Sequence, residues 1–80
     1  MKQTRTCVVC EYGWILVGKV IFDASAEVEL EDAAVVRSWN NGRGIGAISK
    51  RKFKDEYTLD EIGTVYIAKD KILFSIPCEW

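Results

Sequence analysis

The stretch Glu27-Val28-Glu29-Leu30-Glu31 decides the fold class, because its acidic and apolar residues alternate strictly. Successive side chains of a β-strand point to opposite faces, so Val28 and Leu30 share one face and the three glutamates share the other. Such alternation is typical of a half-buried strand. The glutamate row is interpreted as a solubilising face, because carboxylates do acid–base work only in a cleft that shifts their pKa values.

Further short strands are predicted on both sides of this stretch, because β-branched and aromatic residues gather there between turn residues. The predicted strands are Thr6–Glu11, Trp14–Phe22, Glu27–Glu31, Ala33–Trp39, Thr64–Ala68 and Ile72–Ile76. Gly18 interrupts the second strand, which suggests a β-bulge or a close approach of two backbones. Turns are predicted at residues 12–13, 23–26, 40–42 and 69–71, and Pro77 is expected to end the ladder.

The segment Gly44–Lys52 is the one predicted short helix, since Ile45 and Ile48 lie three residues apart and would share a face. Its glycines weaken that prediction. The polar segment Asp55–Gly63 predicts a loop with at most one helical turn.

These elements predict an α+β, mostly β fold: a small antiparallel, partly closed barrel of five or six short strands with one short helix. The pattern fits several barrel topologies. Residues 1–80 are enough for a single domain.

The composition favours a binding protein over an enzyme. The chain has no histidine, which removes the commonest general base and the commonest metal ligand, so no metal or cofactor is expected. A formal net charge of −1 favours neither nucleic acid nor anionic lipid as a partner. The longest apolar run, Trp14–Val17, is too short to span a membrane, and Glu11 and Lys19 interrupt any signal-peptide core. We therefore expect a cytoplasmic protein.

The three cysteines, Cys7, Cys10 and Cys78, predict buried and inert thiols. Cys7 and Cys10 have C-x-x-C spacing, but residues three apart on a strand point to opposite faces. A zinc site would need a fourth ligand, and no histidine can supply it.

The loop after Trp39 is the predicted ligand site. From Gly42 to Ala47 the spacing is G-x-G-x-x-G/A, in which glycines let backbone N–H groups approach a phosphate. An aromatic ring beside amide and guanidinium donors can also stack a planar base. The predicted ligand-binding residues are Trp39, Asn40, Asn41, Gly42, Arg43, Gly44, Lys50 and Arg51.

Each part of this site has a plainer interpretation. The glycines would also suit a flexible turn before a helix, and the basic run Arg43–Lys54 would suit a solvated face. Trp39 would serve equally well as a core residue. Trp14 is most simply a core residue, and Trp80 either packs back on the domain or hangs free.

Short motifs follow one another in order along most of the chain: a glycine-containing first hairpin, an E-V-x-L-x-x-A stretch, a strand ending in Trp, a Gly-Ala helix start and a closing I-P-C. The residues concerned are Gly13, Gly18, Glu27, Val28, Leu30, Ala33, Trp39, Gly42, Ile76, Pro77 and Cys78. In these motifs the chain resembles a family of small, uncharacterised phage-encoded proteins. It departs from them at Ala34, Val35 and Arg37, where the family carries basic residues and a second aromatic. The resemblance implies a phage or prophage origin rather than a particular activity.

The resulting hypothesis is a small phage-type binding protein that sequesters a nucleotide-like, phosphate-bearing ligand, such as an immune signal of the host. An 80-residue barrel can hardly enclose a ligand alone, so a homo-oligomer with a pocket between subunits is expected. The alternative is a protein–protein inhibitor of a host factor that binds by strand addition at an exposed sheet edge. Nucleic-acid binding is a weaker alternative.

Overall fold

A computed structural model describes residues 4–23, 26–39 and 42–80. The strands are β1 (Thr6–Cys10), β2 (Ile15–Asp23), β3 (Glu27–Trp39), β4 (Tyr57–Ala68) and β5 (Ile72–Pro77). Four short 3₁₀ segments connect them, and these are η1 (Glu11–Gly13), η2 (Ile45–Ser49), η3 (Arg51–Glu56) and η4 (Lys69–Lys71). The predicted turn at residues 23–26 includes positions outside the described ranges.

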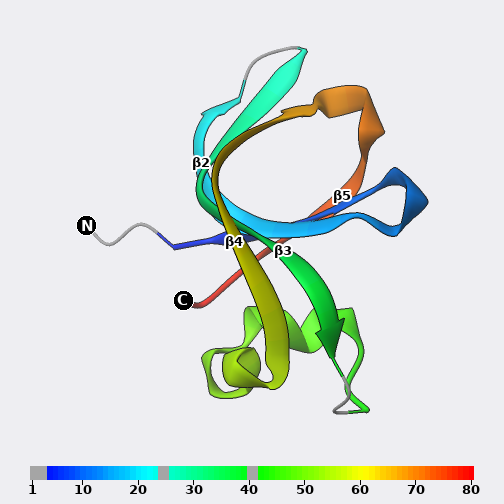
Figure 1. The fold of residues 1–80 in the computed structure, drawn as a ribbon, viewed down its shortest axis with the longest axis vertical. Helices are drawn as coiled ribbons and strands as arrows, with labels where there is room; N and C mark the ends of the chain where they lie inside the picture. Colours follow the sequence, from blue (N-terminus) through cyan, green and yellow to red (C-terminus); the bar gives the residue numbers. More distant parts are fainter. Residues whose placement is uncertain (1–3, 24–25, 40–41) are drawn as a thin grey trace.

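The five strands form one antiparallel sheet in the order β4-β3-β2-β1-β5. The first four strands follow one another as a meander, and β5 returns to pair with β1. The sheet curls strongly (Figure 1), but β4 and β5 are its two edges and are not hydrogen-bonded to each other. The predicted mostly β, antiparallel fold is confirmed, and the curled sheet is an open barrel.

Strands β3 and β4 form a long bent hairpin. Their register runs from Glu27 opposite Ala68 to Trp39 opposite Tyr57, with irregularities that bend both strands. The two strands predicted at 27–31 and 33–39 are therefore one strand of 13 residues. One of the irregularities, between Leu30 and Ala33, includes Asp32, whose φ of 52° is left-handed.

The loop predicted over Asp55–Gly63 was wrong, since most of it belongs to β4. Tyr57 is buried and Leu59 half-buried, whereas Thr58 and Asp60 are exposed, so the segment does alternate. Its many polar residues concealed this pattern, and pairing with β3 supplies the backbone hydrogen bonds that make it a strand.

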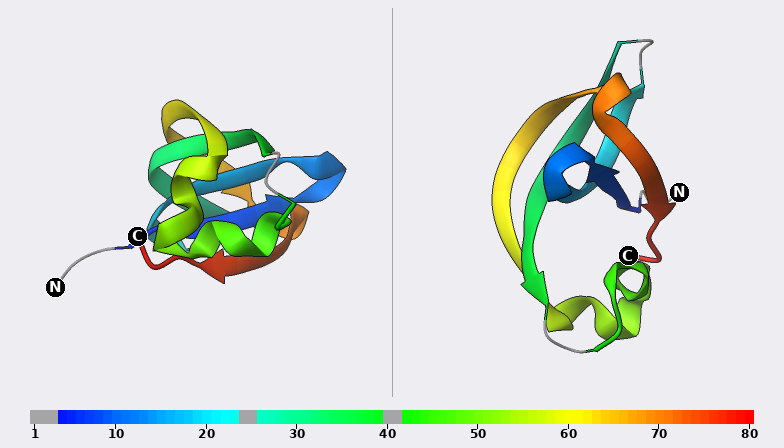
Figure 2. Two further views of the ribbon diagram at one scale, coloured as in Figure 1. Left: turned by 90° about the horizontal axis from the view of Figure 1, so that it is seen from below. Right: turned by 90° about the vertical axis from the view of Figure 1, so that its right-hand side faces the viewer.

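Two apolar clusters pack on opposite faces of the sheet. The first, here called the capped core, consists of Cys7, Val17, Val36, Ile48, Tyr57, Cys78 and Trp80. The second, here called the barrel core, consists of Val8, Cys10, Leu16, Val28, Leu30, Ala33 and Ile67. Segments η2 and η3 and the end of the chain lie together over the capped core, whereas the curled sheet surrounds the barrel core (Figure 2).

The predicted helix over Gly44–Lys52 is instead two 3₁₀ segments, η2 and η3. Lys50 has extended backbone between them, with φ −90° and ψ 125°, which interrupts any continuous helix. Ile45 and Ile48 still face the same side, since Ile48 is fully buried in the capped core and the half-buried Ile45 packs against that core. The indole Nε1–H of Trp80 donates to the Ile48 carbonyl at 2.7 Å, so Trp80 packs back on the domain. Within the described ranges no helix is long and apolar enough to cross a membrane.

Gly18 lies on β2 opposite the irregular part of its antiparallel neighbour β3. The β2–β3 register shifts between Val17 and Lys19, so the predicted bulge is confirmed. A Cβ at Gly18 would lie 3.1 Å from the Leu30 Cβ and 3.2 Å from the Ala33 Cα and Cβ atoms. Both neighbours are buried in the barrel core, and they can yield little space.

Replacing Gly18 by valine should therefore destabilise the fold by about 1–3 kcal/mol through overpacking. Gly46→Ala is the matched control, because a Cβ there meets nothing within 4 Å, and it should change stability by less than about 1 kcal/mol. Urea denaturation of both variants measures the effect. Equal unfolding midpoints would contradict the crowding argument.

Candidate functional site

The predicted loop site begins at Trp39, which is a half-buried residue at the end of β3. Its ring packs against Tyr57 with centroids 5.8 Å apart and planes inclined by 39°, at the margin of the capped core. The Tyr57 hydroxyl donates to the Gly44 carbonyl, which fixes the far side of the loop. Asn40 and Asn41 lie outside the described residues. Trp39 is thus a packing residue with only part of its ring accessible.

Arg43 has protein partners on two sides. Its guanidinium carbon lies 3.9 Å from the centroid of the Phe53 ring, a cation–π contact. Its Nε donates to the Glu56 carboxylate at 3.0 Å. A ligand phosphate would therefore compete with Glu56 for this guanidinium. Gly42 and Gly44 have left-handed φ values of 72° and 79°, which explains why glycine occupies both loop positions.

Lys50 and Arg51 converge on Glu79, next to the end of the chain. Lys50 Nζ lies 3.6 Å from one Glu79 carboxylate oxygen, and the Arg51 backbone N–H donates to the other at 3.0 Å. The Arg51 side chain also donates to the Glu79 carbonyl at 2.9 Å. The Arg51 N–H, helped by the charge and hydrogen bond of Lys50 and by the charge of Arg51, holds the pKa of Glu79 below its usual value.

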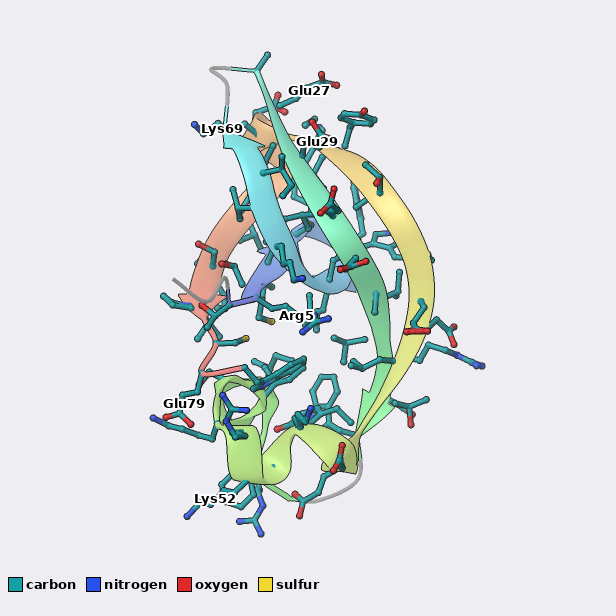
Figure 3. The ribbon with its side chains drawn as sticks, turned by 90° about the vertical axis from the view of Figure 1, so that its left-hand side faces the viewer. Arg5, Glu27, Glu29, Lys52, Lys69 and Glu79 are labelled. Carbon is teal, nitrogen blue, oxygen red and sulfur yellow. The ribbon has the colours of Figure 1, made fainter. Side chains whose placement is uncertain are left out.

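These residues line a shallow cavity of about 680 Å³, here called the basic hollow. Its lining residues are Lys50, Arg51, Lys52, Phe53 and Glu79. Of the predicted site residues, Lys50 and Arg51 therefore line the basic hollow. Arg43 lies next to it, stacked on the Phe53 ring that is part of the lining. Trp39, Gly42 and Gly44 do not line it. Lys52 and Glu79 lie at the opposite end of the molecule from Glu27 and Glu29 (Figure 3).

A second surface, which sequence analysis missed, lies between the β1–β2 turn and β4. It is a groove of about 510 Å³, here called the aromatic groove. Its walls include Tyr12, Trp14, Ile62 and Tyr66, and barrel-core residues such as Leu16 and Ile67 form part of the lining. Tyr12 is 94% exposed, Trp14 59% and Tyr66 62%, so three aromatic rings face solvent around an apolar floor.

The β1–β2 turn places two of these rings. Tyr12 and Gly13 have φ values of 63° and 79°, and the Cys10 N–H donates to the Trp14 carbonyl at 2.7 Å. Left-handed backbone is uncommon for a bulky residue such as tyrosine. The prediction of Trp14 as a core residue was wrong, because β2 begins at Ile15 and Trp14 belongs to the turn. The sequence feature that could have indicated these exposed rings is the pair of aromatic residues, Tyr12 and Trp14, on either side of the turn glycine.

The cysteines are free thiols within the two cores. Cys7 belongs to the capped core and Cys10 to the barrel core, so the prediction that they point to opposite faces is confirmed. Burial, with smaller contributions from Cys78 and Cys10, raises the pKa of Cys7 to about 12. Burial also raises the pKa of Cys10 and of Cys78. Among the described residues no group of three or more metal-binding side chains gathers.

Stability should fall between pH 9 and pH 12 because of Cys7. In the unfolded chain this thiol releases its proton near its ordinary pKa of 9.0, whereas the folded chain retains it up to about 12. The unfolded state then binds fewer protons, so the free energy of unfolding decreases as pH rises. Urea denaturation at pH 8, 10 and 11 should show a steeper loss for the wild type than for Cys7→Val. Parallel pH profiles of the two proteins would contradict this.

Comparisons with known proteins return no match to the chain. No family model matches the sequence, and no curated protein or solved structure is significantly similar to it. Function is therefore argued from the geometry of the basic hollow and the aromatic groove.

Proposed function

We propose that this chain is a non-catalytic binding module that recognises an extended polypeptide segment at the aromatic groove. The observation that supports this proposal is a row of exposed aromatic rings over an apolar floor, beside the unpaired edge of β4. Small soluble domains rarely expose contiguous apolar surface unless it binds something. The predicted alternative, a protein–protein module acting through a sheet edge, is thereby favoured over the loop site.

Two interactions would combine in such a complex. An added strand would pair with backbone N–H and C=O groups on the outer edge of β4, which have no strand partner among the described residues. Alternate side chains of that strand would enter the groove and cover Tyr12, Trp14 and Tyr66. Burying one large apolar side chain contributes about 1.5–3 kcal/mol, and aromatic residues are enriched among those that dominate binding energy.

Selection from a displayed heptapeptide library tests this proposal with the chain at submicromolar concentration. Enriched peptides should alternate apolar residues, and Trp14→Ser combined with Tyr66→Ser should weaken their binding by at least about tenfold, because two of the groove's aromatic walls are lost. Ile21→Ser is the matched control, since Ile21 is exposed but lies outside the groove lining. Peptides that bind all three proteins equally would refute the proposal.

A second candidate function is capture of a nucleotide-like, phosphate-bearing ligand, such as an immune signal of a phage host. The observation that favours it is the basic hollow, which Lys50, Arg51 and Lys52 line together with Phe53. Cationic side chains would hold a phosphate, and a planar base would have to share the Phe53 ring with the Arg43 guanidinium, 3.9 Å from the ring centroid, and with the Lys52 ammonium at 5.0 Å. Glu56 and Glu79 already neutralise part of this charge, so the ligand would have to displace them.

Isothermal titration with a panel of linear and cyclic nucleotides tests this second function. Lys52→Ala and Arg43→Ala should each weaken binding by at least about tenfold. Both side chains are exposed, so the free energy of unfolding should fall by no more than about 1 kcal/mol, the loss of the Arg43 contacts with Phe53 and Glu56 included. Lys71→Ala, far from the hollow in sequence and outside its lining, is the charge-matched control. No heat signal across the panel at micromolar ligand would exclude this function.

A further inference from the structure

We infer that the segment accepted at the aromatic groove is strand β5 of a second copy of this chain, so that copies assemble head to tail. This inference rests on the groove function proposed above and adds the identity of its partner. It also gives a structural basis for the homo-oligomer expected from the sequence.

The two edges of the sheet are the first argument. In the order β4-β3-β2-β1-β5, β4 pairs only with β3 and β5 pairs only with β1. Each edge therefore presents one row of backbone N–H and C=O groups without a strand partner among the described residues. An edge of this kind is a template for pairing with another strand.

The missing edge protection is the second argument. Edge strands of monomeric proteins usually carry charged side chains that prevent pairing. Here β4 has no charged residue from Ile62 to Ala68, and β5 has none from Ile72 to Pro77, where a terminal proline is the only protecting feature. The charged residues of β4, Asp60 and Glu61, lie just outside this stretch. The two edges are therefore unprotected over matching lengths, seven residues of β4 and six of β5.

The distribution of exposed apolar side chains is the third argument. Leu73 of β5 is 63% exposed and Phe74 is 50% exposed, although both lie in the middle of a strand. Most of the large exposed apolar side chains in the described part of the chain lie either at the groove or on this strand. They are Tyr12, Trp14, Ile62, Tyr66, Leu73 and Phe74. Pairing β5 of one copy with β4 of the next would bring the exposed apolar side chains of β5 together with those of the aromatic groove.

The contact is heterologous, because different surfaces of the two copies meet in it. Each copy in a pair keeps one unused edge, so further copies add until a ring closes or a filament forms. An isologous pair of two β4 edges would instead stop at a dimer.

Sedimentation equilibrium of the full chain tests the inference, with one variant on each edge. The wild type should sediment at several times its monomer mass of 9.1 kDa. Tyr66→Lys on β4 and Phe74→Lys on β5 should each become monomeric, because a lysine at either edge loses its solvation on pairing. Ile21→Lys, on β2, should assemble like the wild type. Circular dichroism confirms that each variant is folded, and Leu73→Lys replaces Phe74→Lys if that variant unfolds.

Mixing the two edge variants is the decisive step. Tyr66→Lys keeps an intact β5 edge and Phe74→Lys keeps an intact β4 edge, so an equimolar mixture should form a dimer of twice the monomer mass and stop there. A wild-type chain that remains monomeric, a mixture that remains monomeric, or a β5 variant that still dimerises would overturn the inference. Peptide selection at the groove is a separate measurement, so its success with a monomeric wild type would leave the proposed function standing without self-assembly.

Discussion

The antiparallel pairing of β3 with β4 is the interaction on which the rest of the structure depends. Its 13 and 12 residues make these the longest of the described strands, and their irregular register bends the sheet. At one end the hairpin carries η2 and η3, which cover the capped core and hold the basic hollow. At the other end β4 leads into η4 (Figure 1). The same strand supplies one wall of the aromatic groove. Both candidate surfaces are therefore placed by the same pair of strands.

Alternating patterns in the sequence were sufficient to predict the sheet but not its boundaries. Val28 and Leu30 are buried as their alternation with glutamates indicates, and Glu27 and Glu31 are exposed. The alternation of Tyr57 and Leu59 with polar residues is weaker, because Leu59 is only half-buried and the pattern stops after it, with Asp60 to Thr64 all exposed. Pairing with β3 makes this segment a strand, and the β-propensity of its own residues does not predict that pairing. The continuity of β3 across Asp32 was hidden for a similar reason, since a left-handed residue inside a strand is rarely predictable.

The candidate sites were predicted only in part. The basic run did indicate a charged surface, and Lys50 and Arg51 do line one hollow. Their neutralisation by Glu79, which lies 28 residues from Arg51, depends on how the chain end packs and could not be derived from spacing. The aromatic groove combines residues from the first turn with residues of β4, so it exists only in the folded chain. Trp14 was predicted as a core residue because aromatic residues at the start of a strand usually enter a core, although its place beside the turn glycine Gly13 was a sign of exposure.

The pairing of β1 with β5 has a consequence for the order of folding. Thr6 lies opposite Pro77, and the Cys78 N–H donates to the Arg5 carbonyl at 2.9 Å, so this ladder joins residues separated by almost the whole chain. Closing so long a loop costs conformational entropy before any contact offsets it, and proteins dominated by such distant contacts fold slowly. During synthesis β1 can pair with β2, and β2 with β3, before the chain is finished, whereas the other edge of β1 must wait for β5. Until then the Cys7 side of the sheet lacks its cover from Cys78 and Trp80, so the growing chain exposes an apolar face that the finished chain buries.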